Sequence, residues 1–239
     1  MLWILIGSGL PALLLLVWCY KQDLEQPEPV KLLFKGVFLG IIGTIPVIIL
    51  ELASGMFTNI FPPIMREAYT AFFIAGFIEE GMKYVLLKNF FYKKSEFDQV
   101  MDGIVYAFCI SLGFAFAENF LYGLQNSKVL LVRAFTAVPM HAFSTGIMGY
   151  WLGRQKFDAP DSKLGQKGFG IAVLIHGAYD FFIFVGMFYI SLLVLFVSGR
   201  LLRQAIRSAR NLDSDLDVHY NQILKSIEEK AQQEDESQF

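Results

Sequence analysis

The sequence predicts an all-α fold, a polytopic transmembrane helical bundle of about seven spans. Hydrophobic residues make up 55% of the chain and aromatic residues 15%, which is too apolar for a water-soluble domain. These residues gather in runs of roughly 20, the length at which a helix crosses the hydrocarbon core of a bilayer. Loops rich in charge, proline or glycine separate the runs. We therefore expect a protein embedded in the lipid bilayer.

The first half of the chain contains three of these runs. Residues 2–20 end in aromatic residues followed by a lysine, as is typical of the membrane interface, and they lack the features of a signal peptide. Residues 32–52 form the second run, in which we expect Pro46 to kink the helix. Residues 68–87 form the third run.

The second half of the chain supplies the remaining spans. Residues 97–122 and 132–152 each have the length of one span. Residues 168–202 are apolar throughout, and at 1.5 Å per residue this stretch is too long for one crossing. We expect it to break into two helices near Gly186.

The fourth run carries small residues four positions apart, at Gly103, Ala107, Ser111 and Ala115. This spacing places them on one face of a helix, where they allow another helix to approach closely. Glu118 continues the same face one turn later. We therefore expect the Glu118 side chain to be buried in the bundle.

Lysine and arginine are distributed unevenly among the loops. Loops 21–35, 88–98, 153–167 and 199–212 together hold fourteen, whereas the alternate loops hold only Arg66, Lys128 and Arg133. By the positive-inside rule, the N-terminus lies outside and the C-terminus inside. The chain has no basic cluster of the kind that binds nucleic acid.

Composition divides the chain into two parts. Residues 1–212 contain all the apolar runs and form the expected transmembrane domain. Residues 213–239 hold eight of the 22 acidic residues but only two of the 20 Lys and Arg, and form an acidic, polar, cytoplasmic tail. The tail shows a weak helical pattern at residues 220–227, and we expect its last residues to be disordered.

Seven ionisable side chains lie deep within the apolar runs of four expected spans. An ionised group at the centre of a bilayer costs roughly 3 kcal/mol or more, so such residues are usually functional. The predicted topology puts most of them at or outward of the membrane centre, in one shared cavity. The seven are Glu79, Glu80, Lys83, Glu118, His141, His176 and Asp180.

Helical spacing predicts local contacts within this set. Lys83 follows Glu79 by four residues and Glu80 by three, so its ammonium can lie beside either carboxylate. The two glutamates point about 100° apart and should therefore have different neighbours and roles. Asp180 follows His176 by four residues, so its carboxylate can orient the imidazole.

Three chemistries fit these groups. In the first, a buried carboxylate takes a proton from water while a histidine stabilises the oxyanion or protonates the leaving amine. In the second, the same groups bind a divalent metal that activates the water, although the chain lacks the metalloprotease pattern His-Glu-x-x-His. The third is a proton-coupled transporter, although the two halves show no internal repeat. No Gly-x-Ser-x-Gly pattern supports a serine nucleophile.

At these residues the sequence resembles the PrsW family of bacterial intramembrane proteases, distant relatives of the CAAX prenyl endopeptidases. The similarity is carried by segments 77–83 (FIEEGMK), 102–106 (DGIVY), 113–119 (GFAFAEN) and 176–180 (HGAYD), together with His141. The resemblance implies that residues 1–212 are a transmembrane protease domain. It implies a multi-pass enzyme of the bacterial plasma membrane, whose substrate is a single-span anti-sigma factor cut near the extracytoplasmic face in a site-1-type step.

The resemblance also implies how the acidic pair works. One of Glu79 and Glu80 is expected to be the general base for water, while the other, with Lys83, holds it in place. A glutamic-type endopeptidase of this kind needs no cofactor, and a divalent metal stays open as the alternative. The expected partners are the substrate and the lipid bilayer, without nucleic acid.

The remaining residues receive supporting and catalytic roles from the same resemblance. His176, oriented by Asp180, is the expected oxyanion stabiliser or proton donor, and His141 is the second candidate. Glu118 with Asn119 is expected to line the cavity.

Overall fold

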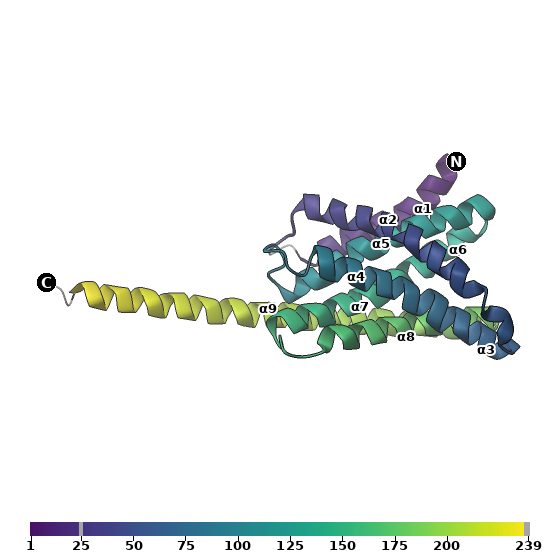
Figure 1. Cartoon of the computed structure of the whole chain (residues 1–239). Helices are drawn as coiled ribbons and strands as arrows, with labels where there is room; N and C mark the ends of the chain where they lie inside the picture. Colours follow the sequence, from purple (N-terminus) through teal and green to yellow (C-terminus); the bar gives the residue numbers. More distant parts are fainter. Residues whose placement is uncertain (24–25, 237–239) are drawn as a thin grey trace.

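The computed structural model describes residues 1–23 and 26–236, with side chains as far as residue 227, and contains helices and no strand in those ranges (Figure 1). Its elements are α1 (Leu2–Tyr20), α2 (Val30–Gly55), η1 (Thr58–Ile60), α3 (Pro63–Ala68), η2 (Tyr69–Glu79), α4 (Glu80–Phe90), α5 (Val100–Gln125), α6 (Val129–Phe135), α7 (Ala137–Phe157), α8 (Leu164–Phe184) and α9 (Phe188–Glu236). The predicted all-α bundle is confirmed.

Five helical stretches in the described residues are long and apolar enough to cross a membrane. They are Leu2–Tyr20, Val30–Ile60, Val100–Gln125, Leu164–Phe184 and Phe188–Ile227. The third and fifth predicted spans are also helical, in η2–α4 and in α7, but these helices carry buried polar side chains, namely Glu79, Glu80, Lys83, His141, Ser144 and Thr145. Those polar side chains lower the mean hydropathy of η2–α4 and of α7. The count of seven spans and their orientation stay predictions.

Helix α5 is the centre of the bundle, buried along nearly its whole length. Glycines bring the neighbouring backbones against it. A Cβ added at Gly40 of α2 would lie 2.0 Å from the Ile110 carbonyl oxygen, and one added at Gly149 of α7 would lie 2.1 Å from the Gly103 oxygen. The close approach predicted at Gly103 is therefore confirmed, but helices pack on every side of α5 and not on one face only.

The third apolar run is not one regular helix. A π-helical segment, η2, ends at Glu79, and the α-helix α4 begins at Glu80. π-Helical turns are rare and frequently mark functional sites. Helix α8 crosses η2 closely, since a Cβ added at Gly177 would lie 2.3 Å from Phe72 Cδ1. This crossing brings α8 beside the paired glutamates.

The predicted break near Gly186 is confirmed, because α8 ends at Phe184, α9 begins at Phe188, and Gly186 has a φ of 78°. Only glycine adopts this left-handed backbone at little cost. Helix α9 then continues through residue 213 and extends far beyond the bundle (Figure 1). The expected boundary at 212/213 is thus not a helix end. The last residues of the expected disordered tail, 237–239, lie outside the described residues.

We call the end of the bundle that α9 leaves the tail end. Arg210 of α9 there donates from Nε to the Gln22 carbonyl oxygen at 2.9 Å. Lys156 donates to the Lys94 carbonyl oxygen at 3.2 Å. These contacts join Gln22 to Arg210 and Lys94 to Lys156, so the loops rich in lysine and arginine meet at this end of the bundle.

Candidate active site

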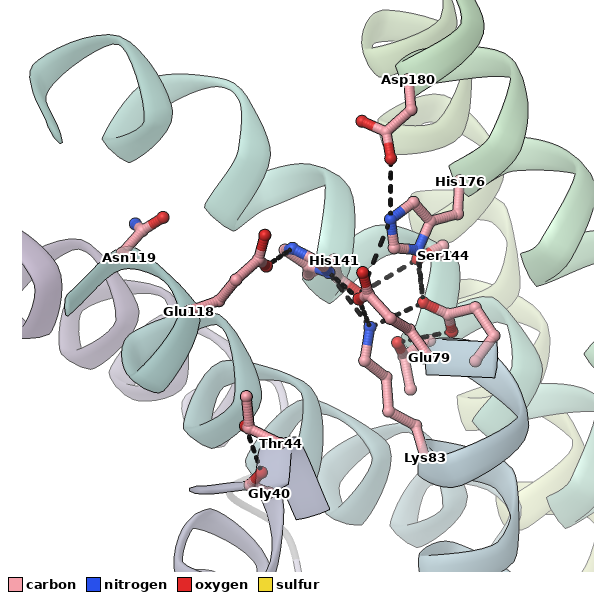
Figure 2. A network of polar contacts seen from close by, with 12 residues as sticks. Gly40, Thr44, Glu79, Lys83, Glu118, Asn119, His141, Ser144, His176 and Asp180 are labelled. Atoms are coloured by element: carbon pink, nitrogen blue, oxygen red, sulfur yellow. Dashed lines mark hydrogen bonds and ion pairs between the residues drawn. The ribbon is translucent and has the colours of Figure 1, made fainter. Parts of the chain in front are cut away.

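Four parts of the fold bring the predicted polar residues together (Figure 2). The η2–α4 junction carries the acidic pair and its lysine, α5 carries Glu118, α7 carries His141, and α8 carries His176 with Asp180. Glu118 lies near the last turns of α5 and His141 near the first turn of α7. The site therefore lies in the half of the bundle away from the tail end.

Glu80 is fully buried and held by four side chains. Its Oε1 lies 2.8 Å from the Lys83 ammonium and 2.9 Å from His176 Nδ1. Its Oε2 accepts a hydrogen bond from Thr145 Oγ1 at 2.9 Å, and Ser144 Oγ lies 3.4 Å from Oε1. Both oxygens are thus occupied, which suits a residue that orders its neighbours.

Glu79 has looser contacts. Its Oε2 lies 3.3 Å from Lys83 Nζ, 3.7 Å from His141 Nδ1 and 3.9 Å from His176 Nε2. The side chain also lines the large cavity described below. Although the two glutamates are adjacent in sequence, their surroundings differ, as the helical geometry predicts. Both nevertheless contact the same lysine.

Each imidazole is oriented by a carboxylate. His141 Nε2 lies 2.8 Å from Glu118 Oε2, and His176 Nε2 lies 3.3 Å from Asp180 Oδ2. The two rings are perpendicular, with centroids 4.9 Å apart. The predicted contact between His176 and Asp180 is present, and Figure 2 shows both imidazoles beside Glu79.

A cavity of about 890 Å³ opens onto this group of side chains. Helices α2, η2, α5, α6 and α8 form its walls, and its aromatic and aliphatic lining is typical of a binding cleft. It is large enough for a short extended peptide. Its polar lining residues include Glu51, Glu79, Glu118, Arg133, Tyr179 and Asp180.

Arg133 is a site residue that the sequence analysis treated only as a loop charge. Its Nε donates to Asn119 Oδ1 at 2.7 Å and its Nη2 donates to Glu118 Oε1 at 2.9 Å, with the guanidinium 4.0 Å from the Tyr122 ring centroid. Asn119, expected to line the cavity with Glu118, is not among the residues that line this one. Its side chain is fully buried and holds Arg133, because neighbouring residues on a helix point about 100° apart.

Sequence reasoning also missed Glu51, Ser144 and Thr145. Glu51 ends the apolar part of α2 and lines the cavity, so an acid within the last turns of a span was the available signal. The hydroxyls of Ser144 and Thr145 contact Glu80. Nothing in their sequence spacing indicates that contact, because the partner lies on another helix.

Glu79, His141 and His176 could also hold a metal ion. Each offers one ligand atom, and these atoms lie within 4.8 Å of one another. Carboxylate oxygen and imidazole nitrogen are zinc ligands, and a carboxylate on the other nitrogen, as Glu118 provides for His141, is the usual support. The residues therefore fit a divalent metal. The Lys83 ammonium contacts two of the same ligands, at 3.0 Å from His141 Nδ1 and 3.3 Å from Glu79 Oε2.

Comparison with known proteins identifies relatives of the chain. The Protease PrsW of Bacillus subtilis (strain 168) is 32% identical over 188 residues, which cover 74% of this chain and 81% of that protein. The Protease PrsW of Oceanobacillus iheyensis is 36% identical over 183 residues, 76% of this chain and 83% of that protein. The Protease PrsW of Clostridioides difficile (strain 630) is 30% identical over 184 residues, 74% and 77% of the two chains.

No solved structure matches the chain. The profile of one family, described as PrsW family intramembrane metalloprotease, matches residues 28–200, the stretch that contains every residue of the site. Together with relatives matched over most of their length, this favours the protease over the transporter interpretation. The chain therefore belongs to the PrsW family of intramembrane proteases.

Proposed function

We propose that this intramembrane protease cuts a membrane-anchored anti-sigma factor near its extracytoplasmic face, in the bacterial plasma membrane, with a water activated by Glu79. The observation that carries the proposal is the cavity, onto which Glu79 opens between two imidazoles. The loops rich in lysine and arginine gather at the tail end, so the positive-inside rule puts the opposite half, with the site, toward the outer leaflet.

Glu79 suits the general base better than Glu80. A base must reach a water in the cavity, and Glu79 lines that cavity while both oxygens of Glu80 are engaged. The Glu79 carboxylate takes a proton from water, and the water oxygen bonds to the scissile carbonyl carbon. Glu80 and Lys83 position the base. The Lys83 ammonium, within 3.3 Å of both acids, offsets their charge in the low dielectric of the bundle.

The histidines complete the reaction. Negative charge develops on the carbonyl oxygen as water adds, and His176, oriented by Asp180, donates a hydrogen bond to it or passes a proton to the leaving amine. His141, oriented by Glu118, is the second candidate donor, and to act it would have to exchange the contact between its Nδ1 and the Lys83 ammonium for one with the substrate. The carbon–nitrogen bond then breaks as the proton that Glu79 took from water passes to the amine nitrogen, directly or through His176, leaving a carboxylate and an amine. A substrate helix must unwind first, because its peptide groups are otherwise hydrogen-bonded within the helix.

The metal-dependent alternative is favoured by one observation, the close convergence of Glu79, His141 and His176. A divalent metal bound there would supply a Lewis acid for the scissile carbonyl. In that case Glu79 would be a ligand, and Lys83 would have to give up its contacts with Glu79 and His141.

The test is cleavage of a single-span anti-sigma substrate in liposomes, with the products mapped by mass spectrometry. The full-length wild type should cut near the outer end of the substrate span, whereas Glu79→Gln and His176→Ala should not. His219→Ala, an exposed histidine of the tail, is the matched control and should cut normally. No cut by the wild type, or equal cutting by all variants, contradicts the proposal.

A chelator arm separates the two mechanisms. Activity unchanged after exhaustive chelation supports water activated by glutamate alone. If chelation abolishes activity and Zn²⁺ restores it, Glu79, His141 and His176 act as metal ligands. A cut at the tail-end side of the span would overturn the predicted orientation.

A further inference from the structure

A second cluster of buried carboxylates lies at the tail end, apart from the candidate active site. Asp23 follows α1, Glu28 precedes α2, and Asp102 lies in the first turn of α5. Each offers one oxygen, and the three oxygens lie within 4.8 Å of one another. Asp102 precedes Glu118 by 16 residues on α5, so the two sites are about 24 Å apart along the helix.

The three side chains are almost inaccessible, with 6% of Asp23, 5% of Glu28 and 1% of Asp102 exposed. Some of their oxygens have a defined use. Asp102 Oδ2 caps α5 by accepting from the backbone N–H of Asp98 and Gln99 at 2.8 and 2.6 Å. The Tyr106 hydroxyl donates to Glu28 Oε2.

Two buried oxygens of the cluster have no such use. Asp23 Oδ2 and Asp102 Oδ1 are inaccessible and accept no hydrogen bond from an N–H or hydroxyl group of any residue that the structure describes, although the Asp102 and Glu28 carboxyls lie close enough to share a hydrogen bond when one of them is protonated. A buried polar atom without a partner is costly, and a buried carboxylate more so. The capping of α5 explains Asp102 Oδ2, and Tyr106 and the shared carboxyl contact engage Glu28, but nothing in the described structure engages Asp23 Oδ2.

Two basic side chains lie near these acids, Arg210 beside Asp23 and Lys156 beside Asp102. Within the described residues, no lysine or arginine forms an ion pair with any of the three. Arg210 is the basic group that faces Asp23, and its Nε is engaged by the Gln22 carbonyl oxygen at 2.9 Å. Asp213 adds another carboxylate nearby. Burial, reinforced by the Glu28 carboxylate, raises the pKa of Asp23 to about 7, and burial raises the pKa of Glu28 as well.

We propose that Asp23, Glu28 and Asp102 bind a hard divalent cation, Mg²⁺ or Ca²⁺. Both ions prefer oxygen ligands supplied by carboxylates and water, and this cluster offers oxygen and no nitrogen. A cavity of about 320 Å³, lined by Asp23, Met101, Arg210 and Asp213, adjoins the cluster at Asp23. This donor set differs from the one at Glu79, which includes two imidazoles.

The ion would join three segments of the tail end. It would tie the linker between α1 and α2 to the first turn of α5. Asp213 of α9 accepts from the backbone N–H of Val100 and Met101 in that same turn, at 2.7 and 3.0 Å. Ion binding would therefore stabilise the turn on which α9 is anchored.

The test uses the full-length protein in nanodiscs, stripped with a chelator at pH 8. Addition of Ca²⁺ or Mg²⁺ to saturation should raise its Tm by about 5 °C or more. Tb³⁺, a luminescent substitute for Ca²⁺, should bind and be excited through Tyr106, which contacts Glu28. Comparison of the two ions identifies the preferred one.

Asp23→Asn is the decisive variant, because no hydrogen bond of the described structure depends on the Asp23 side chain. It should lose the response to Ca²⁺, Mg²⁺ and Tb³⁺. In chelator it should be at least as stable as the wild type, since it removes a buried negative charge. Asp161→Asn, an exposed acid in the loop before α8, is the matched control and should respond as the wild type does.

Three outcomes would overturn the proposal. The first is a wild-type Tm and Tb³⁺ signal that do not change with the ions. The second is a Tm that rises on acidification in chelator while the ions do nothing, which would mean that the carboxyls share protons. The third is loss of the Ca²⁺ and Mg²⁺ response in Glu79→Gln, which would assign the effect to the other site.

Discussion

Replacement of each adjacent glutamate by glutamine should separate catalysis from stability. Glu79→Gln keeps the size of the side chain and removes the proposed base. Loss of a general base lowers kcat by about 10²–10⁴-fold. The Glu79 side chain makes only a 3.3 Å contact with Lys83 and looser contacts with the imidazoles, so Tm should stay close to that of the wild type.

Glu80→Gln should instead destabilise the fold. It leaves the fully buried Lys83 ammonium without its 2.8 Å carboxylate partner. Breaking a buried ion pair from one side costs about 3–5 kcal/mol. For a chain of this length each kcal/mol lowers Tm by about 2–4 °C, so the expected loss is roughly 10 °C. Adding Lys83→Met to this variant should recover much of the loss, because it removes the unpaired charge.

The assay combines thermal unfolding in nanodiscs with cleavage kinetics of a quenched single-span substrate in liposomes. Glu67→Gln, on the same helical run but outside the site, serves as the control for both measurements. Activity of Glu79→Gln above a tenth of the wild type would refute its role as base. An inactive Glu80→Gln with a wild-type Tm would show that the two roles are exchanged.

Three further predictions concern packing, support and pH. Gly40→Ala should destabilise the bundle by about 1–3 kcal/mol, because the added Cβ would lie 2.0 Å from a backbone oxygen, whereas Gly170→Ala, with nothing within 4 Å, should be neutral in thermal unfolding. Arg133→Gln should lower kcat/KM by about 10-fold or more with a nearly unchanged Tm, because it releases the Glu118 carboxylate that orients an imidazole. The pKa of Asp23 is raised from 3.8 to about 7, so between these pH values the folded state holds a proton that the unfolded chain has released. In chelator, Tm should therefore fall as pH rises from about 4 to about 7. The fall should be smaller in Asp23→Asn.

The contacts that the sequence predicted between residues three and four apart along the chain are present. Lys83 lies within 3.3 Å of both glutamates, and His176 lies 3.3 Å from Asp180. Residues three and four apart on a helix are neighbours whatever the tertiary fold, so spacing alone is sufficient. The break at Gly186 was predictable for a similar reason, since helix length and the need for a left-handed residue are local properties.

Contacts between helices could not be predicted in this way. The pairing of Arg133 with Glu118 joins α6 to α5, and the hydrogen bond from Thr145 to Glu80 joins α7 to α4. Such pairs depend on the crossing points and rotations of the helices, which the glycine contacts around α5 set. The same packing decides that Glu79 and not Glu80 meets the cavity.

The sequence alone thus determined a helical membrane protein, its buried ionisable residues and its family. The length of an apolar run and the cost of a charge in a bilayer are properties of each segment by itself. They can therefore be predicted from the sequence without knowledge of the tertiary structure. Only the tertiary structure decided that Glu79 faces the cavity and that Arg133 holds Glu118. It also decided that Asp23, Glu28 and Asp102 meet at the tail end. These depend on where separate segments pack against one another, which no local pattern encodes.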